Sequence, residues 1–261
     1  MKGIFIVILL CMLYSGEGYI IYAQEDGELI TDTDNTLKKN ERKNLERMVD
    51  YEIGFFNKIF SDKQYTKLDA DILIFSDYGE YLAYQRKIGK TIYTRSPGFY
   101  SPDDYQIVIC KDKFEKTFLT TCYHELSHFF LMSRAAHVPV WLNEGIATYM
   151  EGVKISSKDI KHVIGKYFVS RVKTMVTLKD INLREFVIWS GREFSQTSFS
   201  YDGYGYAIAH CMIHVMMDNE EVAFNVIKAV CNDKIETIKA FDLYYAGGFD
   251  QFEKDFFSRY K

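Results

Sequence analysis

Two histidines four residues apart, His124 and His128, lie in the segment HELSH at 124–128. Residues at this spacing on a helix lie one turn above one another, so both imidazoles can reach a single metal ion. Glu125 is rotated about 100° around the helix axis from the first histidine. It can therefore face a metal-bound water molecule without being a ligand itself. This spacing predicts a helix that carries two zinc ligands and a general base.

A catalytic zinc ion takes three protein ligands and keeps one position open. The best candidate for the third ligand is Glu144, in the segment WLNEG at 141–145. Pro139 precedes this segment and separates two predicted helical runs, which lets the second run turn back toward the first. The sequence contains no CxxC pattern, so a zinc site built from thiolates is disfavoured. We expect one zinc ion per chain, bound by His124, His128 and Glu144.

Together the segments HELSH and WLNEGIATYME resemble the gluzincin metallopeptidases, in which HExxH and a later Asn-Glu-Gly carry the zinc site. The match to the large zinc aminopeptidases is close at these segments. However, the chain is too short for their multidomain build and lacks a segment like their Gly-Ala-Met-Glu-Asn motif. The better resemblance is to small bacterial peptidase-MA-like proteins, which share a Gly-Phe-Tyr stretch and a Tyr-led helix. Their counterparts here are Gly98 to Tyr100 and Tyr204 to Ala207, and the resemblance is specific over residues 95 to 151.

This resemblance implies an α+β fold of the zincin (thermolysin-like) type, with a mixed-sheet N-terminal lobe, a helical C-terminal lobe and the metal between them. It also implies hydrolysis of peptide bonds in a peptide or protein substrate. Zinc lowers the pKa of its water toward about 7, and Glu125 takes the proton and passes it to the leaving amine. Gluzincins usually add a tyrosine or histidine that donates to the oxyanion. Tyr204 is the first candidate because it opens a helix 60 residues after Glu144, and Tyr206 and His210 are the alternatives.

A rival interpretation keeps the peptidase-like fold as a surface or binding protein whose metal is structural or lost. The presence of all four site residues favours an enzyme, because a degenerate copy would be expected to lose Glu125 first. Hydrolysis of a non-peptide amide would use the same residues. No feature of the sequence names the substrate, since specificity resides in pocket shape and loops. The sequence does not indicate an oligomeric state either.

Three other polar residues bear on this site. His210 and His214 form a second pair at helical spacing, but no acidic residue follows His210. We interpret them as partly buried structural histidines. Thr148 lies one turn after Glu144, where some relatives carry an acid that orients a ligand histidine. The residue that orients the ligands here must therefore come from elsewhere in the chain.

The N-terminus predicts export. Lys2 precedes an apolar run from Gly3 to Leu13, and the small residues Gly16 and Gly18 follow, as in a secretory signal peptide. Cleavage after Gly18 or after Ala23 fits the pattern equally well. The run is too short to span a bilayer comfortably, so an uncleaved anchor is the less favoured alternative. We expect a periplasmic, cell-surface or secreted protein with no stable membrane span after cleavage.

Composition indicates one large domain. The chain has 261 residues, of which 48% are hydrophobic and 16% aromatic, enough for a sizeable packed core. Its formal net charge is −4 and no basic run reaches five residues, so nucleic acid is a disfavoured partner. We divide the chain into a signal peptide (1–23), a flexible leader (24–35) and a metallopeptidase domain (36–261), whose lobes cover 36–132 and 133–261. Export permits disulfides among Cys110, Cys122, Cys211 and Cys231, but no spacing requires one.

Hydrophobic periodicity predicts the elements that must position these residues. The expected strands cover 71–75, 91–94 and 105–110, and the last two flank a Gly-Phe-Tyr-Ser-Pro turn. The expected helices cover 36–60, 79–87, 113–132, 157–175, 182–189, 203–217, 220–231, 234–245 and 249–260. The strand at 105–110 is either a sheet edge on which an extended peptide could pair or an interior strand.

Overall fold

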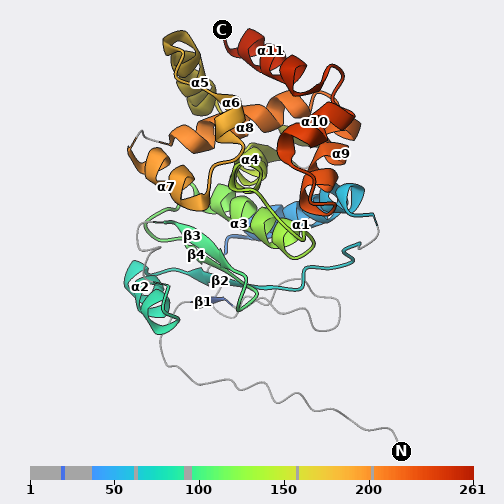
Figure 1. Ribbon diagram of the computed structural model, residues 1–261. Coiled ribbons are helices and arrows are strands. Elements are labelled where there is room, and N and C mark those ends of the chain that lie inside the picture. The colour runs from blue at the N-terminus through green and yellow to red at the C-terminus, as the bar shows by residue number, and fades with distance from the viewer. Residues whose placement is uncertain (1–18, 21–36, 62–63, 91–95, 157–158, 201–202) are drawn as a thin grey trace, which may run out of the picture.

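The computed structural model of the protein describes residues 19–20, 37–61, 64–90, 96–156, 159–200 and 203–261 (Figure 1). The predicted signal peptide and leader lie outside these residues, apart from Tyr19 and Ile20, and so does the predicted strand at 91–94. Within the described part, a small sheet lies at one end of the molecule and helices build the remainder (Figure 1). The fold is therefore mixed α+β and mostly helical.

The main sheet has the strand order β1-β2-β4-β3. Its strands are Tyr19–Ile20 (β1), Asp71–Phe75 (β2), Gln106–Cys110 (β4) and Gly98–Ser101 (β3). Strands β2 and β4 are parallel, whereas β1 and β3 pair antiparallel with β2 and β4. Because β4 lies between two partners, the segment at 105–110 is an interior strand and offers no edge to a substrate.

The Gly-Phe-Tyr-Ser segment differs from its prediction. It was expected to be a turn, but it forms β3, and Phe99 and Tyr100 pair with Val108 and Ile107 of β4. Its alternating aromatic side chains bury against opposite faces of the sheet, which stabilises a strand over a turn. The turn follows directly, at residues 102–105.

The two faces of the sheet are buried by different helices. One face packs into the main core with α1 (Lys39–Ile59) and α3 (Phe118–Met132), through the isoleucines Ile72, Ile74, Ile107 and Ile109. The other face packs against α2 (Tyr78–Lys87), through Leu73, Phe75, Val108 and Cys110. The two-residue period of a strand places these sets on opposite faces. Helix α3 therefore packs directly on one face of the sheet.

Helix α4 (Val140–Glu151) is the centre of the helical lobe. It contacts α3 along one side and α8 (Tyr204–Met216) along another (Figure 1). The outer helices are α5 (Lys166–Leu178), α6 (Leu183–Phe186), α7 (Gly191–Ser200), α9 (Glu220–Cys231), α10 (Thr237–Tyr244) and α11 (Gly248–Tyr260). No helix in the described part of the chain is long and apolar enough to span a bilayer.

Several helical predictions require correction. The expected helix at 157–175 begins only at Lys166, because β5 (Val153–Ile155) and β6 (Ile160–His162) form an antiparallel hairpin first. Helix α7 was not predicted at all. Helix α3 begins at Phe118, later than the predicted 113, because turns occupy the preceding residues.

Candidate metal centre

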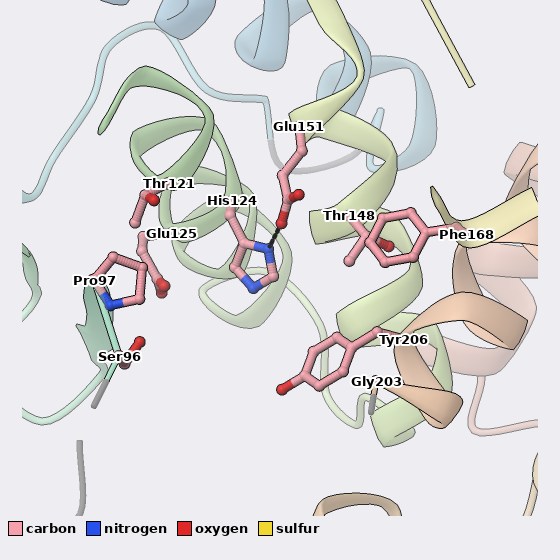
Figure 2. Close-up of a pocket in the computed structure, with 10 residues that line it drawn as sticks. All are labelled: Ser96, Pro97, Thr121, His124, Glu125, Thr148, Glu151, Phe168, Gly203 and Tyr206. Atoms are coloured by element: carbon pink, nitrogen blue, oxygen red, sulfur yellow. Dashed lines mark hydrogen bonds and ion pairs between the residues drawn. The ribbon is translucent and has the colours of Figure 1, made fainter. Parts of the chain in front are cut away.

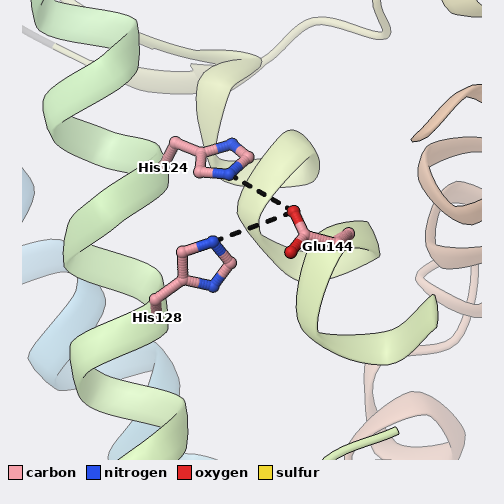
Figure 3. A group of neighbouring side chains, drawn as sticks. All are labelled: His124, His128 and Glu144. Atoms are coloured by element: carbon pink, nitrogen blue, oxygen red, sulfur yellow. Dashed lines mark ion pairs between the residues drawn. The ribbon is translucent and has the colours of Figure 1, made fainter. Parts of the chain in front are cut away.

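The three predicted zinc ligands meet in space. His124 and His128 project from one face of α3 toward Glu144 on α4 (Figure 3). Oε2 of Glu144 lies 3.5 Å from Nε2 of His124 and 3.8 Å from Nε2 of His128. One potential ligand atom from each residue lies within 4.8 Å of the others, and among the described residues no other trio of His, Cys, Asp or Glu does so.

The separations fit a tetrahedral ion, because donor atoms about 2.0–2.2 Å from zinc are roughly 3.4 Å apart. The far nitrogen of each imidazole has an oxygen acceptor. Nδ1 of His124 lies 2.6 Å from Oε1 of Glu151, and Nδ1 of His128 lies 3.1 Å from Oδ1 of Asn143. When Nδ1 donates to these oxygens, Nε2 keeps its lone pair toward Glu144. The side chains present therefore suit a zinc ion.

Two residues of the WLNEG segment, Trp141 and Gly145, fix the position of α4. Trp141 is fully buried, and its Nε1 donates to Oγ1 of Thr237 at 3.3 Å, which ties the start of α4 to α10. Gly145 faces α8 at very short range. A Cβ at this position would lie 2.9 Å from Cγ1 of Ile213 and 3.0 Å from the carbonyl oxygen of Ala209. The glycine thus permits close packing of α4 on α8 directly beside the third ligand.

Glu125 is buried to 6% exposure and lines a cavity of about 290 Å³ together with His124 (Figure 2). Burial raises the pKa of the Glu125 carboxyl, and the two ligand histidines only partly offset this effect. A carboxylate with a raised pKa beside a candidate metal centre is suited to accept and release a proton. The cavity gives it access to a small molecule or a peptide segment.

The charges of two ligands depend on their contacts. Burial opposes the negative charge of Glu144, but His128 and His124 outweigh that effect and lower its pKa. Burial likewise opposes a positive charge on His124, but Glu144 and Glu151 raise the pKa of this imidazole well above its usual value. These contacts favour the ionised forms of both side chains, and a metal ion that binds here would displace the proton of His124.

The structure distinguishes between Tyr204 and Tyr206, the two candidates for the hydrogen-bond donor to the oxyanion. The Tyr204 hydroxyl donates to the carbonyl oxygen of Asp180, its ring stacks on Trp189, and it does not line the cavity. Tyr206 does line the cavity, and its hydroxyl points into the space in front of His124 (Figure 2). Burial, followed by the charges of nearby glutamates, raises the pKa of Tyr206, so its phenol keeps its proton.

The second histidine pair is part of a buried aromatic cluster. His210 and His214 lie 4.6 Å apart between ring centroids, and Tyr149 packs against His214 on one side and His162 on the other. Nε2 of His210 accepts a hydrogen bond from the backbone of Gly165 at 3.1 Å, and His210 does not line the cavity. This placement agrees with the structural role predicted for the pair.

Two residues that hold the ligands were not singled out from the sequence. Asn143 immediately precedes the third ligand, and Glu151 follows it by seven residues, which is two helical turns on the same face. Thr148 lies one turn after Glu144, and its hydroxyl donates to the carbonyl of Glu144 at 2.8 Å and not to a histidine. A carboxylate two turns beyond the ligand is the signal that identifies Glu151.

Comparisons with known proteins add one finding. A family model described as a protein of unknown function (DUF1570) matches residues 119–234. No curated protein matches the chain. The matched segment contains His124, Glu125, His128, Glu144 and Tyr206, so the chain is similar to this family over the region that holds the candidate metal centre.

Proposed function

We propose that this protein is a zinc-dependent peptidase. The observation that carries the proposal is the convergence of His124, His128 and Glu144 with a buried carboxylate, Glu125, one residue after the first ligand. The arrangement of a sheet lobe, a metal-bearing α3 and a helical lobe supports assignment to the zincin type of fold. The Lys2-led apolar run in the sequence supports export, so we propose an extracytoplasmic substrate.

In this proposal, His124, His128 and Glu144 would hold a zinc ion, which when bound would supply a Lewis acid for the substrate carbonyl and make its water more acidic. Glu125 accepts the proton of the attacking water and delivers it to the leaving amine. The Tyr206 hydroxyl donates a hydrogen bond to the oxygen that becomes negatively charged. Asn143 and Glu151 hold the two imidazoles in the orientation and tautomer that binding requires.

Metal analysis and peptide cleavage test this proposal together. Purified protein is expected to hold about one equivalent of zinc and to cleave members of a mixed peptide library. A chelator should abolish cleavage, and added zinc should restore it. Glu144→Ala should lose zinc, whereas Glu221→Ala, which removes an exposed carboxylate of α9, should keep it.

The possible failures of this experiment have distinct meanings. Full zinc retention in Glu144→Ala would remove Glu144 from the ligand set. A zinc-loaded protein that cleaves no peptide would contradict the peptidase proposal. It would favour instead a binding protein or a hydrolase of non-peptide amides.

A further inference from the structure

The side chain of Glu151 contacts His124 and is still partly exposed. Its Oε1 lies 2.6 Å from Nδ1 of His124, yet 33% of the side chain remains exposed, compared with 17% for Glu144. Glu151 also lines the cavity. A carboxylate that served only to orient the imidazole would need one oxygen, so Oε2 is available to a group that enters the cavity.

The described wall of the cavity carries carboxylates and no basic side chain. Glu125 and Glu151 line it, Glu144 lies beside them, and no Lys or Arg among the described residues is part of its wall. Among the described residues, a bound zinc ion would balance the carboxylates of Glu144 and Glu151, and an ionised Glu125 would leave an excess of one negative charge. Charges inside a partly enclosed cavity are screened less than surface charges, so this excess attracts a cation.

Aromatic side chains lie on the same side of the cavity as Glu151. Figure 2 shows Phe168 and Tyr206 on the side formed by the helical lobe, whereas Pro97 and Glu125 lie opposite. Aromatic faces attract cations and also pack against an aliphatic chain. A lysine or arginine side chain carries both groups, whereas a small cation carries only the charge.

The position of Glu151 also indicates how far the charged group of the substrate must lie from the scissile carbonyl. Glu151 bonds the far nitrogen of the His124 imidazole, so the whole ring separates its carboxylate from the nitrogen that faces Glu144. The α-amine of a substrate is held close to the scissile carbonyl, so it could not reach past this ring to the Glu151 carboxylate. The stem of lysine or arginine is long enough.

We propose that Glu151, together with Phe168 of the same cavity wall, forms a subsite for a lysine or arginine side chain adjacent to the scissile bond. This inference rests on the proposed peptidase function and names the substrate class of the same site. Glu151 then has two roles, since one oxygen positions His124 and the other pairs with the substrate cation.

Binding tests this subsite independently of chemistry. Peptides that differ only by lysine, arginine or norleucine at one position are titrated into zinc-loaded Tyr206→Phe protein, which keeps all three carboxylates and is expected to turn over slowly. The basic peptides should bind about tenfold more tightly, the low end for a hydrogen bond to a charged group. The preference should disappear when Glu151→Gln is added and shrink when Phe168→Leu is added. Glu221→Gln, which removes the same charge from exposed surface, should leave the preference intact.

Cleavage by the wild-type protein is the second readout, as the ratio of kcat/KM for basic over norleucine peptides. This ratio should fall toward one in Glu151→Gln, whose amide oxygen can still accept from His124. Equal binding of basic and norleucine peptides, or an unchanged preference in Glu151→Gln, would overturn the subsite. Preferential binding without cleavage of any peptide would instead contradict the peptidase function and leave the cation subsite standing.

Discussion

At the scale of single residues, the site depends on what holds each imidazole. Nε2 of each ligand histidine faces Glu144, and Nδ1 of each faces an oxygen on α4, from Glu151 or Asn143. One helix therefore supplies both the third ligand and the two residues that orient the other ligands. The orientation of both rings depends on how α4 lies against α3.

Asn143→Ala is expected to weaken zinc binding by about 10- to 100-fold, because His128 loses the acceptor that orients its ring. Competition with a chromophoric chelator measures this affinity. Asn219→Ala is the matched control. Asn219 caps α9 through the backbone of Val222, so its loss should lower stability and leave zinc affinity unchanged. Equal zinc affinity in Asn143→Ala and wild type would contradict the role assigned to Asn143.

Tyr206→Phe should lower kcat by about 10²- to 10³-fold with little change in KM, as expected for a hydrogen bond made mainly in the transition state. Steady-state kinetics on one peptide measures both constants. Tyr204→Phe is the paired variant. It removes the hydrogen bond to the carbonyl of Asp180 and should cost about 1 kcal/mol of stability without lowering kcat. The reverse pattern would restore Tyr204, the first candidate from the sequence, as the donor.

At the scale of elements, the close approach of α4 to α8 sets the position of Glu144. Gly145→Ala is expected to cost about 1–3 kcal/mol, because the added methyl meets Ile213 and the backbone of Ala209. It should also weaken zinc binding, since α4 must move. Denaturant unfolding measures the first effect.

Gly54→Ala in α1 provides the control for Gly145→Ala. A Cβ at Gly54 meets nothing within 4 Å, so alanine should be neutral or stabilise the protein by up to about 1 kcal/mol. If both variants have the same stability as wild type, the proposed close contact between α4 and α8 does not constrain the site.

The sequence predicted most elements whose periodicity extends over a long or strongly apolar segment. Strand β2 and helix α9 have the predicted bounds, and α1, α2, α8 and α11 differ from theirs by a few residues at most. The β5–β6 hairpin was missed because its strands have three residues each, too few to show a period. Helix α7 was missed because its sequence is rich in serine and poor in apolar residues. Its Phe194 is nevertheless buried, against Phe186 and Tyr206.

The site was predictable where it depends on local spacing. The convergence of His124, His128 and Glu144, with Glu125 next to them, follows from residue types within two helical segments, and their role as ligands stays a prediction. The choice between Tyr204 and Tyr206 does not, because residues two apart on a helix point about 200° away from each other. Only the packing of α8 against its neighbours decides which hydroxyl reaches the cavity. Glu151 depends in the same way on the position of α4 beside α3.

At the scale of the whole molecule, the three proposed ligands join α3, which packs on the sheet, to α4, the centre of the helical lobe. Disulfides do not contribute to this connection in the described residues. The thiols there are buried and unpaired: Cys110, Cys122, Cys211 and Cys231. Core packing and the proposed metal centre therefore hold the two lobes together.

The buried histidine cluster should make the protein sensitive to acid. Burial lowers the pKa of His162 and His214 to about 4 and that of His210 to about 3. Below a pH of about 6.5 the unfolded chain binds protons that the folded chain does not. The contribution of these three histidines to stability should therefore be complete above this pH and fall as the pH approaches about 4.

His214→Phe tests this pH dependence. It keeps the ring contact with Tyr149 and removes one titrating group, so the loss of stability between pH 6.5 and 4 should become shallower by on the order of 1 kcal/mol per pH unit. Urea unfolding at several pH values measures this slope. An unchanged slope would show that other groups govern the acid sensitivity.

The most direct test of a zinc-dependent peptidase with Glu125 as its general base is the turnover of Glu125→Gln. It is measured beside wild type on the same peptide and at the same zinc content. Glu125 is not a proposed ligand, so both proteins should fold and hold about one equivalent of zinc. Loss of the positioned base should lower kcat by at least about 10²-fold. Cleavage by Glu125→Gln at the wild-type rate would contradict the proposed peptidase site, because the activity would then arise somewhere other than this metal centre.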